Sequence, residues 1–515
     1  MRTSEDLFNL IKSLNKSEKG YFKKYTSMHV IGQKNNYMKL FEETDKQKKY
    51  DEQKIRNAFK GEKFTNQLSV VKNYLYNLIL KSLEAYHSDI DSQLRSSLRH
   101  AYILYEKNLY SQCKKILKMV KQLGYKYGKH NILLEIIELE KQIARKESYL
   151  GKTDKDIAAV HVEERKLLKD ILTERKLESL DSRICLLFLR EGLVRNKKTL
   201  KKYQEIIKKL SLKKEKDLPF KARTSLYHAK SFYYLVKGDH ENYMKYSERN
   251  FSYMELFPFQ QELHYQDYMI AISNYGIAAI GLRKYGDATK AIEKLKLVQE
   301  KLFLNKTDQK KYELPLFKYM FFLEIKLYID TGEFEKGVLL IPSIEKGLDQ
   351  FQGALGKYNE TVFTYYIFYL YFGQRQYTEA LKWLNKLQDS PDGEIIADYY
   401  YFSRILQLIL HYEIGNKDYL EYLIRSVYRF LYKRQKIHKF ETAILDFIRK
   451  LPYVSIEKDL VDVFKQLRME LVNLFKNPFE KKVFGYFDFI SWIESKIEKK
   501  SFIEIVKLKA NNSNC

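Results

Sequence analysis

The feature that most limits the possible folds is a pattern of paired helices that recurs along the middle of the chain. Each copy has two runs of apolar residues at helical spacing, joined by a short polar elbow, as in Asn274 to Leu295, NYGIAAIGLRKYGDATKAIEKL. A ring residue lies near the start of each second run: Tyr110, His240, Tyr285, Phe334, Tyr377 and Tyr419. From His240 onward it recurs at intervals of 42 to 49 residues. A two-helix unit of this size buries its apolar face by stacking on neighbours, so the pattern predicts an all-α fold built as an α-solenoid.

Composition supports this prediction. The 515 residues include only 20 Gly and 7 Pro, and folds made of strands and turns need both residue types at their corners. Four prolines fall between the predicted helices: Pro219, Pro258, Pro315 and Pro391. Pro342 falls inside one, where we expect a kink or a late helix start.

A chain of this length exceeds the usual limit for a single core, so we expect more than one part. The changes in pattern predict an N-terminal helical domain over residues 1–90, the solenoid over 91–440, and a helical C-terminal cap with a polar tail over 441–515. Terminal units of a solenoid have to cover its open ends, which explains an atypical final part.

Within the N-terminal part, the sequence predicts a short helix over 51–60, a turn at Gly61 and a long helix over 65–86. This spacing superficially fits a helix-turn-helix. The second helix, however, carries apolar residues along nearly its whole length: Val70, Val71, Tyr74, Leu75, Leu78, Ile79 and Leu83. A stripe that continuous predicts a face packed in a core, which disfavours a role in reading DNA.

The hairpins resemble tetratricopeptide repeats. In that family a small residue in the first helix, an aromatic residue at the start of the second and an alanine three residues later let the two helices approach closely. Gly276, Tyr285 and Ala288 match these positions in one copy, and Tyr377 and Ala380 match the last two in another. The period here is longer than the family's 34 residues. The resemblance implies a non-enzymatic scaffold or regulator whose concave face binds a peptide or protein segment.

The family's frame also implies which first-helix residues face the concave groove. They combine aromatic rings with polar and cationic groups, which suits capture of an extended or helical peptide: His228, Phe232, Ser273, Phe322, Lys326, Tyr365, Tyr369, Arg404, Gln407 and His411. Aromatics at helical spacing are also typical of packing between neighbouring hairpins, the interpretation that we favour for the aromatic members. For Lys326, Arg404 and Gln407 the alternative is simple exposure to solvent.

Charge offers a second hypothesis. The formal net charge is +26, from 92 Lys and Arg against 66 Asp and Glu, and a nucleic-acid partner is one explanation for such an excess. The most basic stretch is 191–240, where lysines flank an apolar stripe at helical spacing that includes Tyr203, Ile206 and Leu210. That arrangement favours a solvated helix face. The alternative function is a nucleic-acid-associated regulator that uses this stretch and the N-terminal domain.

The sequence motifs give no catalytic, cofactor-binding or metal-binding residues. No phosphate-binding glycine loop occurs, no two histidines stand three or four residues apart, and Cys113, Cys185 and Cys515 are not clustered. We therefore predict a protein without enzymatic activity and without a cofactor. The charged N-terminus and the shortness of the uncharged runs predict a cytoplasmic protein with no membrane partner.

Overall fold

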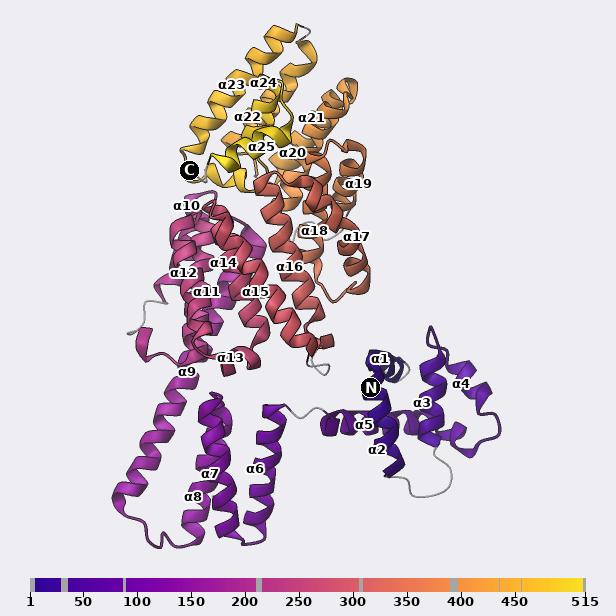
Figure 1. Ribbon diagram of the computed structural model, residues 1–515, viewed down its shortest axis with the longest axis vertical. Coiled ribbons are helices and arrows are strands. Elements are labelled where there is room, and N and C mark those ends of the chain that lie inside the picture. The colour runs from indigo at the N-terminus through magenta and orange to yellow at the C-terminus, as the bar shows by residue number, and fades with distance from the viewer. Residues whose placement is uncertain are drawn as a thin grey trace. The chain divides into compact units, whose positions relative to one another are not determined.

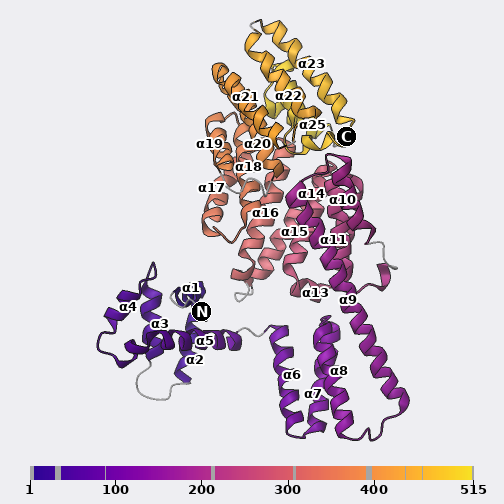
Figure 2. The same ribbon diagram turned by 180° about the vertical axis from the view of Figure 1, so that it is seen from behind.

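All regular secondary structure is helical within the part of the chain that a computed structural model describes. The described residues are 5–28, 36–86, 89–209, 215–304, 309–389, 397–434, 436–454 and 456–512. They form 25 α-helices and four short 3-10 turns, and these ranges contain no strand (Figures 1 and 2). The prediction of an all-α fold is therefore confirmed.

Two compact units make up the chain, Met1–Leu167 and Leu168–Cys515. The division falls inside the longest helix, α9 (Asp154–Glu191). It lies within the region 91–440 that the sequence predicts as one domain. We call the two parts unit 1 and unit 2.

Unit 1 contains two groups of helices, each with its own core. The first group is α1 (Asp6–Ser13), α2 (Lys16–Met28), α3 (Asn36–Lys46), α4 (Glu52–Ala58), the turn η1 (Lys63–Gln67) and α5 (Leu68–Tyr86). The second is α6 (Ile90–Glu106), α7 (Tyr110–Lys126), α8 (His130–Lys146) and the first part of α9. Buried Leu75 and Ile79 of α5 belong to the first core, and Leu117 and Ile136 belong to the second.

Helix α5 buries a narrower stripe than its sequence predicts. The buried positions are Leu68, Lys72, Leu75, Ile79 and Ser82, which lie three or four residues apart. Val70 and Tyr74 were expected in the core but are 64% and 52% exposed. Tyr74 stands about a third of a turn and Val70 nearly half a turn from the buried line, so this core covers only one side of the helix.

Unit 2 continues as consecutive helices that pack in order along the chain. Their bounds are α10 (Lys197–Lys208), η2 (Glu215–Asp217), α11 (Phe220–Lys237), α12 (His240–Glu255), α13 (Pro258–Leu263), α14 (Tyr265–Gly281), α15 (Tyr285–Leu304), α16 (Gln309–Thr331), α17 (Phe334–Gln350), α18 (Lys357–Gly373), α19 (Tyr377–Gln388), α20 (Ala397–Ile414) and α21 (Lys417–Lys433). From α14 to α20, each even-numbered helix packs on the odd-numbered helix that follows it and on the next even-numbered one.

The elbow residues mark the helix starts well. Tyr110, His240, Tyr285, Phe334 and Tyr377 are the first residues of α7, α12, α15, α17 and α19, whereas Tyr419 is the third residue of α21. Gly276 in α14 allows close helix packing, which is the steric role that the sequence suggests. A Cβ on Gly276 would lie 2.7 Å from the methyl groups of Leu323, so α14 and α16 approach too closely there for a side chain.

The prolines correct two expectations. Pro219 precedes α11 and Pro258 begins α13, as expected, but Pro315 lies inside α16. Pro342 lies inside α17, which begins at Phe334, so a late helix start is wrong. Buried residues on both sides of each proline, such as Leu316 in α16, hold the helix in place despite the missing N–H. Pro391 lies outside the described residues.

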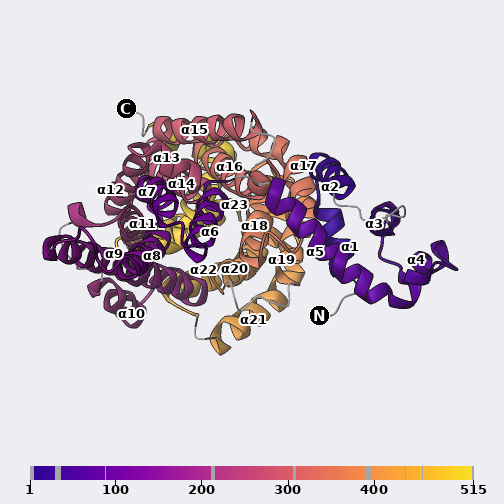
Figure 3. The same ribbon diagram turned by 90° about the horizontal axis from the view of Figure 1, so that it is seen from below.

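The C-terminal helices share one hydrophobic core with the second half of unit 2. They are α22 (Lys439–Lys450), η3 (Leu451–Tyr453), α23 (Glu457–Phe475), η4 (Lys481–Gly485), α24 (Phe489–Glu498) and α25 (Phe502–Asn511). This core runs from Ile325 in α16 to Val506 in α25. In the view of Figure 3, one set of helices lies nearer the middle of unit 2 and the other lies farther out. The nearer set is α11, α14, α16, α18 and α20, and the farther set is α12, α15, α17, α19 and α21. We call the first set the inner helices and the second set the outer helices.

Candidate functional site

The inner helices of unit 2 hold part of the chain's own C-terminus. We call residues 481–511, which form η4, α24 and α25, the C-terminal segment. Tyr365 Oη of α18 donates a hydrogen bond to the carbonyl oxygen of Tyr486 at 2.9 Å, and the amide of Asp488 donates to Tyr369 Oη at 2.9 Å. Both tyrosines therefore bind main-chain groups of the segment.

Further contacts fix the segment to helices α18 and α20. The ring of Phe487 lies 4.9 Å from that of Tyr369 and 5.1 Å from that of Phe372, centroid to centroid. Trp492 Nε1 donates to a carboxylate oxygen of Glu413 at 2.7 Å, and Lys496 pairs with the other oxygen at 2.6 Å. Aromatic packing and charge-assisted bonds thus supplement the main-chain contacts.

Half of the predicted groove residues are buried, which for Tyr365 and Tyr369 agrees with the packing role favoured for the aromatic members and for Gln407 corrects the alternative of simple exposure to solvent. Tyr365 and Tyr369 are 0% and 6% exposed because the C-terminal segment covers them. Burial raises the pKa of both hydroxyls well above the usual value, so both stay protonated, and Tyr365 uses its proton to donate to the segment. Ser273, Gln407 and His411 are also buried, at 3%, 8% and 7% exposure, inside α14 and α20.

Two features of α20 show why its polar residues are not on an open surface. The guanidinium of Arg404 lies over the rings of Tyr400 and Phe430, 5.4 and 5.2 Å from their centroids, and is half-buried. His411 Nδ1 is 3.2 Å from the side-chain amide of Asn416, and burial lowers the pKa of the imidazole. The sequence places these residues on the correct helix but does not show what covers them.

The other predicted residues, His228, Phe232, Phe322 and Lys326, remain half-buried. Phe232 belongs to a line of half-buried rings that joins α11, α9, α18 and α20. Centroid distances along it are 5.2 Å from Phe232 to Phe188, 6.1 Å from Phe188 to Tyr358 and 6.5 Å from Tyr358 to Tyr399. We call these four residues the inner aromatic row. Phe188, Tyr358 and Tyr399 were not singled out from the sequence, because their proximity comes from helices up to 211 residues apart.

A pocket of about 370 Å³ lies between the helix hairpins and the C-terminal segment. Lys326 and Tyr369 line it, together with Arg283 and Asp488. Lys326 forms an ion pair with Asp330 at 2.9 Å, and Arg283 donates to the carbonyl oxygen of Lys509 at 3.3 Å. The walls therefore carry both signs of charge.

A buried ion network anchors the start of the C-terminal segment. Arg195, in the loop between α9 and α10, pairs with Glu441 of α22 and, at 2.9 Å, with Glu480 just before η4. The three side chains are 11%, 3% and 9% exposed. The same loop accepts a hydrogen bond from Lys482 Nζ at the carbonyl oxygen of Val194. One basic residue of the stretch 191–240 is thus used inside the fold.

Five of the twelve lysines in that stretch belong to α10. Tyr203 and Ile206 are buried, whereas Lys197, Lys198 and Lys201 are exposed. Within the described ranges none of these three lysines forms an ion pair. The helix therefore has the amphipathic character that the sequence predicts, with an unneutralised basic face.

One combination of side chains was not foreseen from the sequence, although His228 was singled out for another role. Asp181 and Cys185 stand one turn apart on α9, and His228 faces them from α11; the ligand atoms of all three lie within 4.8 Å of one another. His228 Nδ1 is 2.7 Å from Asp181 Oδ1. Burial lowers the pKa of the imidazole, but the charge and hydrogen bond of Asp181 outweigh this and raise the pKa above its usual value. The spacing of Asp181 and Cys185 is visible in the sequence, but their approach to His228 is not.

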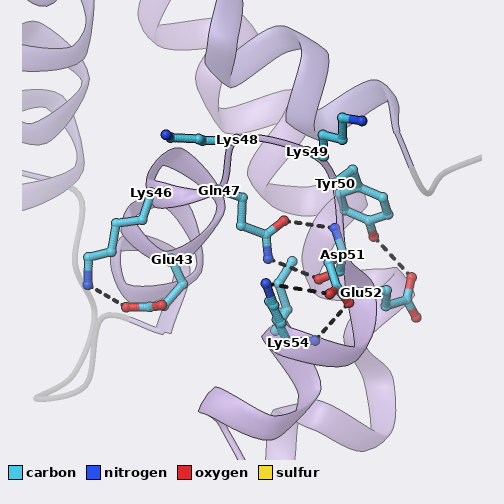
Figure 4. A pocket seen from close by; sticks show the side chains of 10 residues that line it. Glu43, Lys46, Gln47, Lys48, Lys49, Tyr50, Asp51, Glu52 and Lys54 are labelled. Atoms are coloured by element: carbon cyan, nitrogen blue, oxygen red, sulfur yellow. Dashed lines mark hydrogen bonds and ion pairs between the residues drawn. The ribbon is translucent and has the colours of Figure 1, made fainter.

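Unit 1 has a separate hollow of about 920 Å³ where α3 meets α4 (Figure 4). Its polar groups bond mainly to one another. The side chain of Gln47 makes two hydrogen bonds with the main chain of Asp51, both at 2.9 Å, and Tyr50 Oη donates to Glu52 at 3.0 Å. Lys48 and Lys49 point in opposite directions (Figure 4). These contacts shape the loop, and the residues do not converge on a common point.

Comparison with known proteins leaves the family open. The sequence matches no family model, and a search of the curated proteins finds no match either. Within the described ranges, none of the helices combines the length and the apolar character that a bilayer crossing requires.

Proposed function

We propose that the chain is a non-catalytic cytoplasmic scaffold or regulator, in which unit 2 is a tetratricopeptide-like α-solenoid and its inner helices bind a segment of another protein. One observation carries this proposal: the inner helices already hold a polypeptide, the C-terminal segment. Tyr365 and Tyr369 contact its main chain. Such contacts are available in every polypeptide, so the same kind of surface suits a segment of a partner.

The inner aromatic row is the part of this surface that we assign to the partner. Its rings are half-buried, and one end of the row adjoins the face that the C-terminal segment covers, since Tyr399 is 5.0 Å from Tyr365 and 5.2 Å from Tyr486 of that segment, centroid to centroid. Rings of this kind supply large contact area with few rotatable bonds, and aromatic residues are enriched where proteins bind one another. We expect the partner to present apolar or aromatic anchors to Phe232 and Tyr358.

Site-specific photo-cross-linking tests this assignment. A photoreactive amino acid replaces Tyr358 of the inner row or, as control, Leu339 of outer helix α17, which is 78% exposed. In extracts of the native host, the probe at 358 should give a cross-link to a defined protein, and the probe at 339 should not. The substitution Phe232→Asp, made in the chain with the probe at 358, should reduce the cross-link.

Two results would contradict the proposal. One is equal labelling from positions 358 and 339, because it would mean that contact is not specific to the inner helices. The other is a cross-link at 358 that Phe232→Asp leaves unchanged, because the aromatic row would then contribute nothing. Absence of any cross-link at 358 under conditions where the chain is folded counts against the proposal as well.

A nucleic-acid-associated regulator is the second candidate, and the exposed lysines of α10 favour it. Lys197, Lys198 and Lys201 lie on one solvent-facing side of the helix. Binding through such contacts weakens steeply with salt, because each neutralised phosphate releases a counterion. Fluorescence anisotropy with labelled single- and double-stranded oligonucleotides between 50 and 200 mM salt, roughly the range where this effect is large, tests it. No binding at the lowest salt would exclude this function.

A further inference from the structure

The group formed by Asp181, Cys185 and His228 points to a function that the sequence motifs do not suggest. Asp181 and Cys185 stand at positions i and i+4 of α9, so their side chains leave the same face of the helix. His228 comes from the middle of α11. The three side chains are neither sealed in the core nor fully exposed, since Asp181 and His228 are 22% and 21% exposed and Cys185 is half-buried.

Apolar neighbours on both helices fix the backbone positions of these residues. Leu177, Leu180 and Ile184 of α9 and Leu226 and Ala229 of α11 are buried in one hydrophobic cluster. These apolar residues alternate with the polar ones along both helices. Apolar packing therefore holds α9 against α11, and this packing places the three polar side chains close to one another.

The distances fit a small tetrahedral metal ion. The candidate ligand atoms lie within 4.8 Å of one another. Zinc bonds of about 2.0 Å to nitrogen and oxygen and about 2.3 Å to sulfur place tetrahedral ligands roughly 3.3 to 3.5 Å apart. The contact of 2.7 Å between His228 Nδ1 and Asp181 Oδ1 has to widen by less than 1 Å, and the two separations from the Cys185 sulfur, at most 4.8 Å, have to close by at most about 1.3 Å.

We propose that Asp181, Cys185 and His228 bind a zinc ion that links α9 to α11. A thiolate, an imidazole and a carboxylate form a ligand set that zinc prefers, whereas calcium and magnesium prefer oxygen ligands alone. Cys185 coordinates as the thiolate and gives up its proton to solvent. Three protein ligands leave a fourth position for water.

Nearby charge favours a cation at this place. Asp267 of α14 interacts electrostatically with both Asp181 and His228. Lys221 of α11 also acts on Asp267, so the surroundings are not uniformly acidic. With the Cys185 thiolate, two carboxylates and one lysine, the group carries a net negative charge that a divalent ion reduces.

Cobalt serves as the spectroscopic probe for zinc in the test. The full-length chain is reduced, freed of metal with a chelator and titrated with Co²⁺. We expect one equivalent to bind with tetrahedral d–d absorption and with a charge-transfer band from a thiolate ligand, and Zn²⁺ to displace it. Cys185→Ser should abolish the charge-transfer band, and His228→Gln should weaken binding at least about 100-fold, more than the loss of a residue that only supports a ligand.

The other cysteines provide the matched control. Cys113 is fully buried in α7 and its Sγ lies 3.2 Å from the carbonyl oxygen of Ala101. The double variant Cys113→Ser/Cys515→Ser should keep the band. A band that persists in Cys185→Ser, or that disappears only in the double variant, overturns the proposal.

A second measurement needs no variant. Zinc should slow alkylation of Cys185 by a maleimide in the wild-type chain, as followed by mass spectrometry of the peptides, and should leave the rate at Cys113 unchanged. Equal rates at Cys185 with and without zinc overturn the proposal, even if a variant at this position fails to fold.

Discussion

Removal of Arg195 is the perturbation that most sharply tests how the C-terminal segment is anchored. Arg195 lies between the carboxylates of Glu441 and Glu480, and all three side chains are at most 11% exposed. In Arg195→Met the apolar stem remains but the positive charge is lost. Two buried carboxylates then face each other without a counter-charge.

The magnitude follows from this arrangement. Breaking a buried ion pair on one side costs about 3–5 kcal/mol, because the partner stays buried and unpaired. Main-chain amides offset part of the loss: Glu441 still accepts from His438 at 3.0 Å, and Glu480 accepts from Lys439 and Phe440 at 3.3 Å. We therefore expect Arg195→Met to lower the free energy of unfolding of unit 2 by about 3 kcal/mol, the lower end of that range.

Urea unfolding followed by tryptophan fluorescence is the assay. Both tryptophans of the chain, Trp383 and Trp492, lie in unit 2, so the signal reports on this unit. The matched control is Arg175→Met. The pair of Arg175 with Glu178 is exposed on both sides, at 65% and 60%, and its loss should cost less than about 0.5 kcal/mol.

A charge-balanced variant separates electrostatics from packing. Adding Glu441→Gln and Glu480→Gln to Arg195→Met removes the unpaired charges, and most of the lost stability should return. If Arg195→Met is no more destabilising than Arg175→Met, the buried ion network does not stabilise unit 2. If the triple variant is less stable than Arg195→Met alone, unpaired charge is not the cause of the loss.

Three further predictions concern packing and pH. Gly276→Ala should destabilise unit 2 by about 1–3 kcal/mol in the same urea assay, because the alanine Cβ would meet Leu323. The control Gly286→Ala, which has open space around the added Cβ, should be neutral or stabilising by up to about 1 kcal/mol. Hydrogen bonds from Lys72 and then Arg56 are the main causes that lower the pKa of Glu52 from 4.5 to about 2. The stability that this adds should be lost as pH falls from 4.5 to about 2, and hydrogen exchange in α5 should then become faster. The substitution Glu52→Gln should remove this pH dependence. Burial, and then the charge of Arg195, lowers the pKa of Lys482 from 10.5 to about 8. Because the folded state binds this proton less tightly than the unfolded state does, the wild type should gain stability relative to Lys482→Met as pH rises from about 8 to 10.5. A difference in stability that stays constant over this range would contradict the burial of this lysine.

The sequence predicts the helices and their turns well because those signals are local. A ring residue after a polar elbow marks the first residue of α12, α15, α17 and α19, and the small residue Gly276 lies where α14 and α16 approach too closely for a side chain. The elbow pattern that identifies these positions depends on residues within a few turns of each other. Pro315 was misplaced for a related reason, since packing on both sides of it outweighs the local preference to end a helix.

The candidate site is less predictable because long-range contacts create it. Tyr365 and Tyr369 look like groove residues from their helical positions, but a segment about 120 residues further along the chain covers them. No local pattern in Tyr486 or Asp488 specifies α18 as the place where they bind. The approach of Cys185 to His228 depends in the same way on how α9 packs against α11. Sequence periodicity assigns a residue to a face of a helix but does not show what lies against that face.

Amide exchange at Asp488 measures whether the inner helices of unit 2 bind polypeptide main chain through tyrosine hydroxyls. Its N–H donates to Tyr369 Oη, whereas the N–H of Ser491 donates to the side chain of Asp488 within the same segment. In Tyr369→Phe, residue-resolved hydrogen exchange should become about 5- to 10-fold faster at Asp488, which corresponds to a hydrogen bond of about 1–1.4 kcal/mol, and should stay unchanged at Ser491. Equal exchange at Asp488 in the wild type and in Tyr369→Phe would contradict the account.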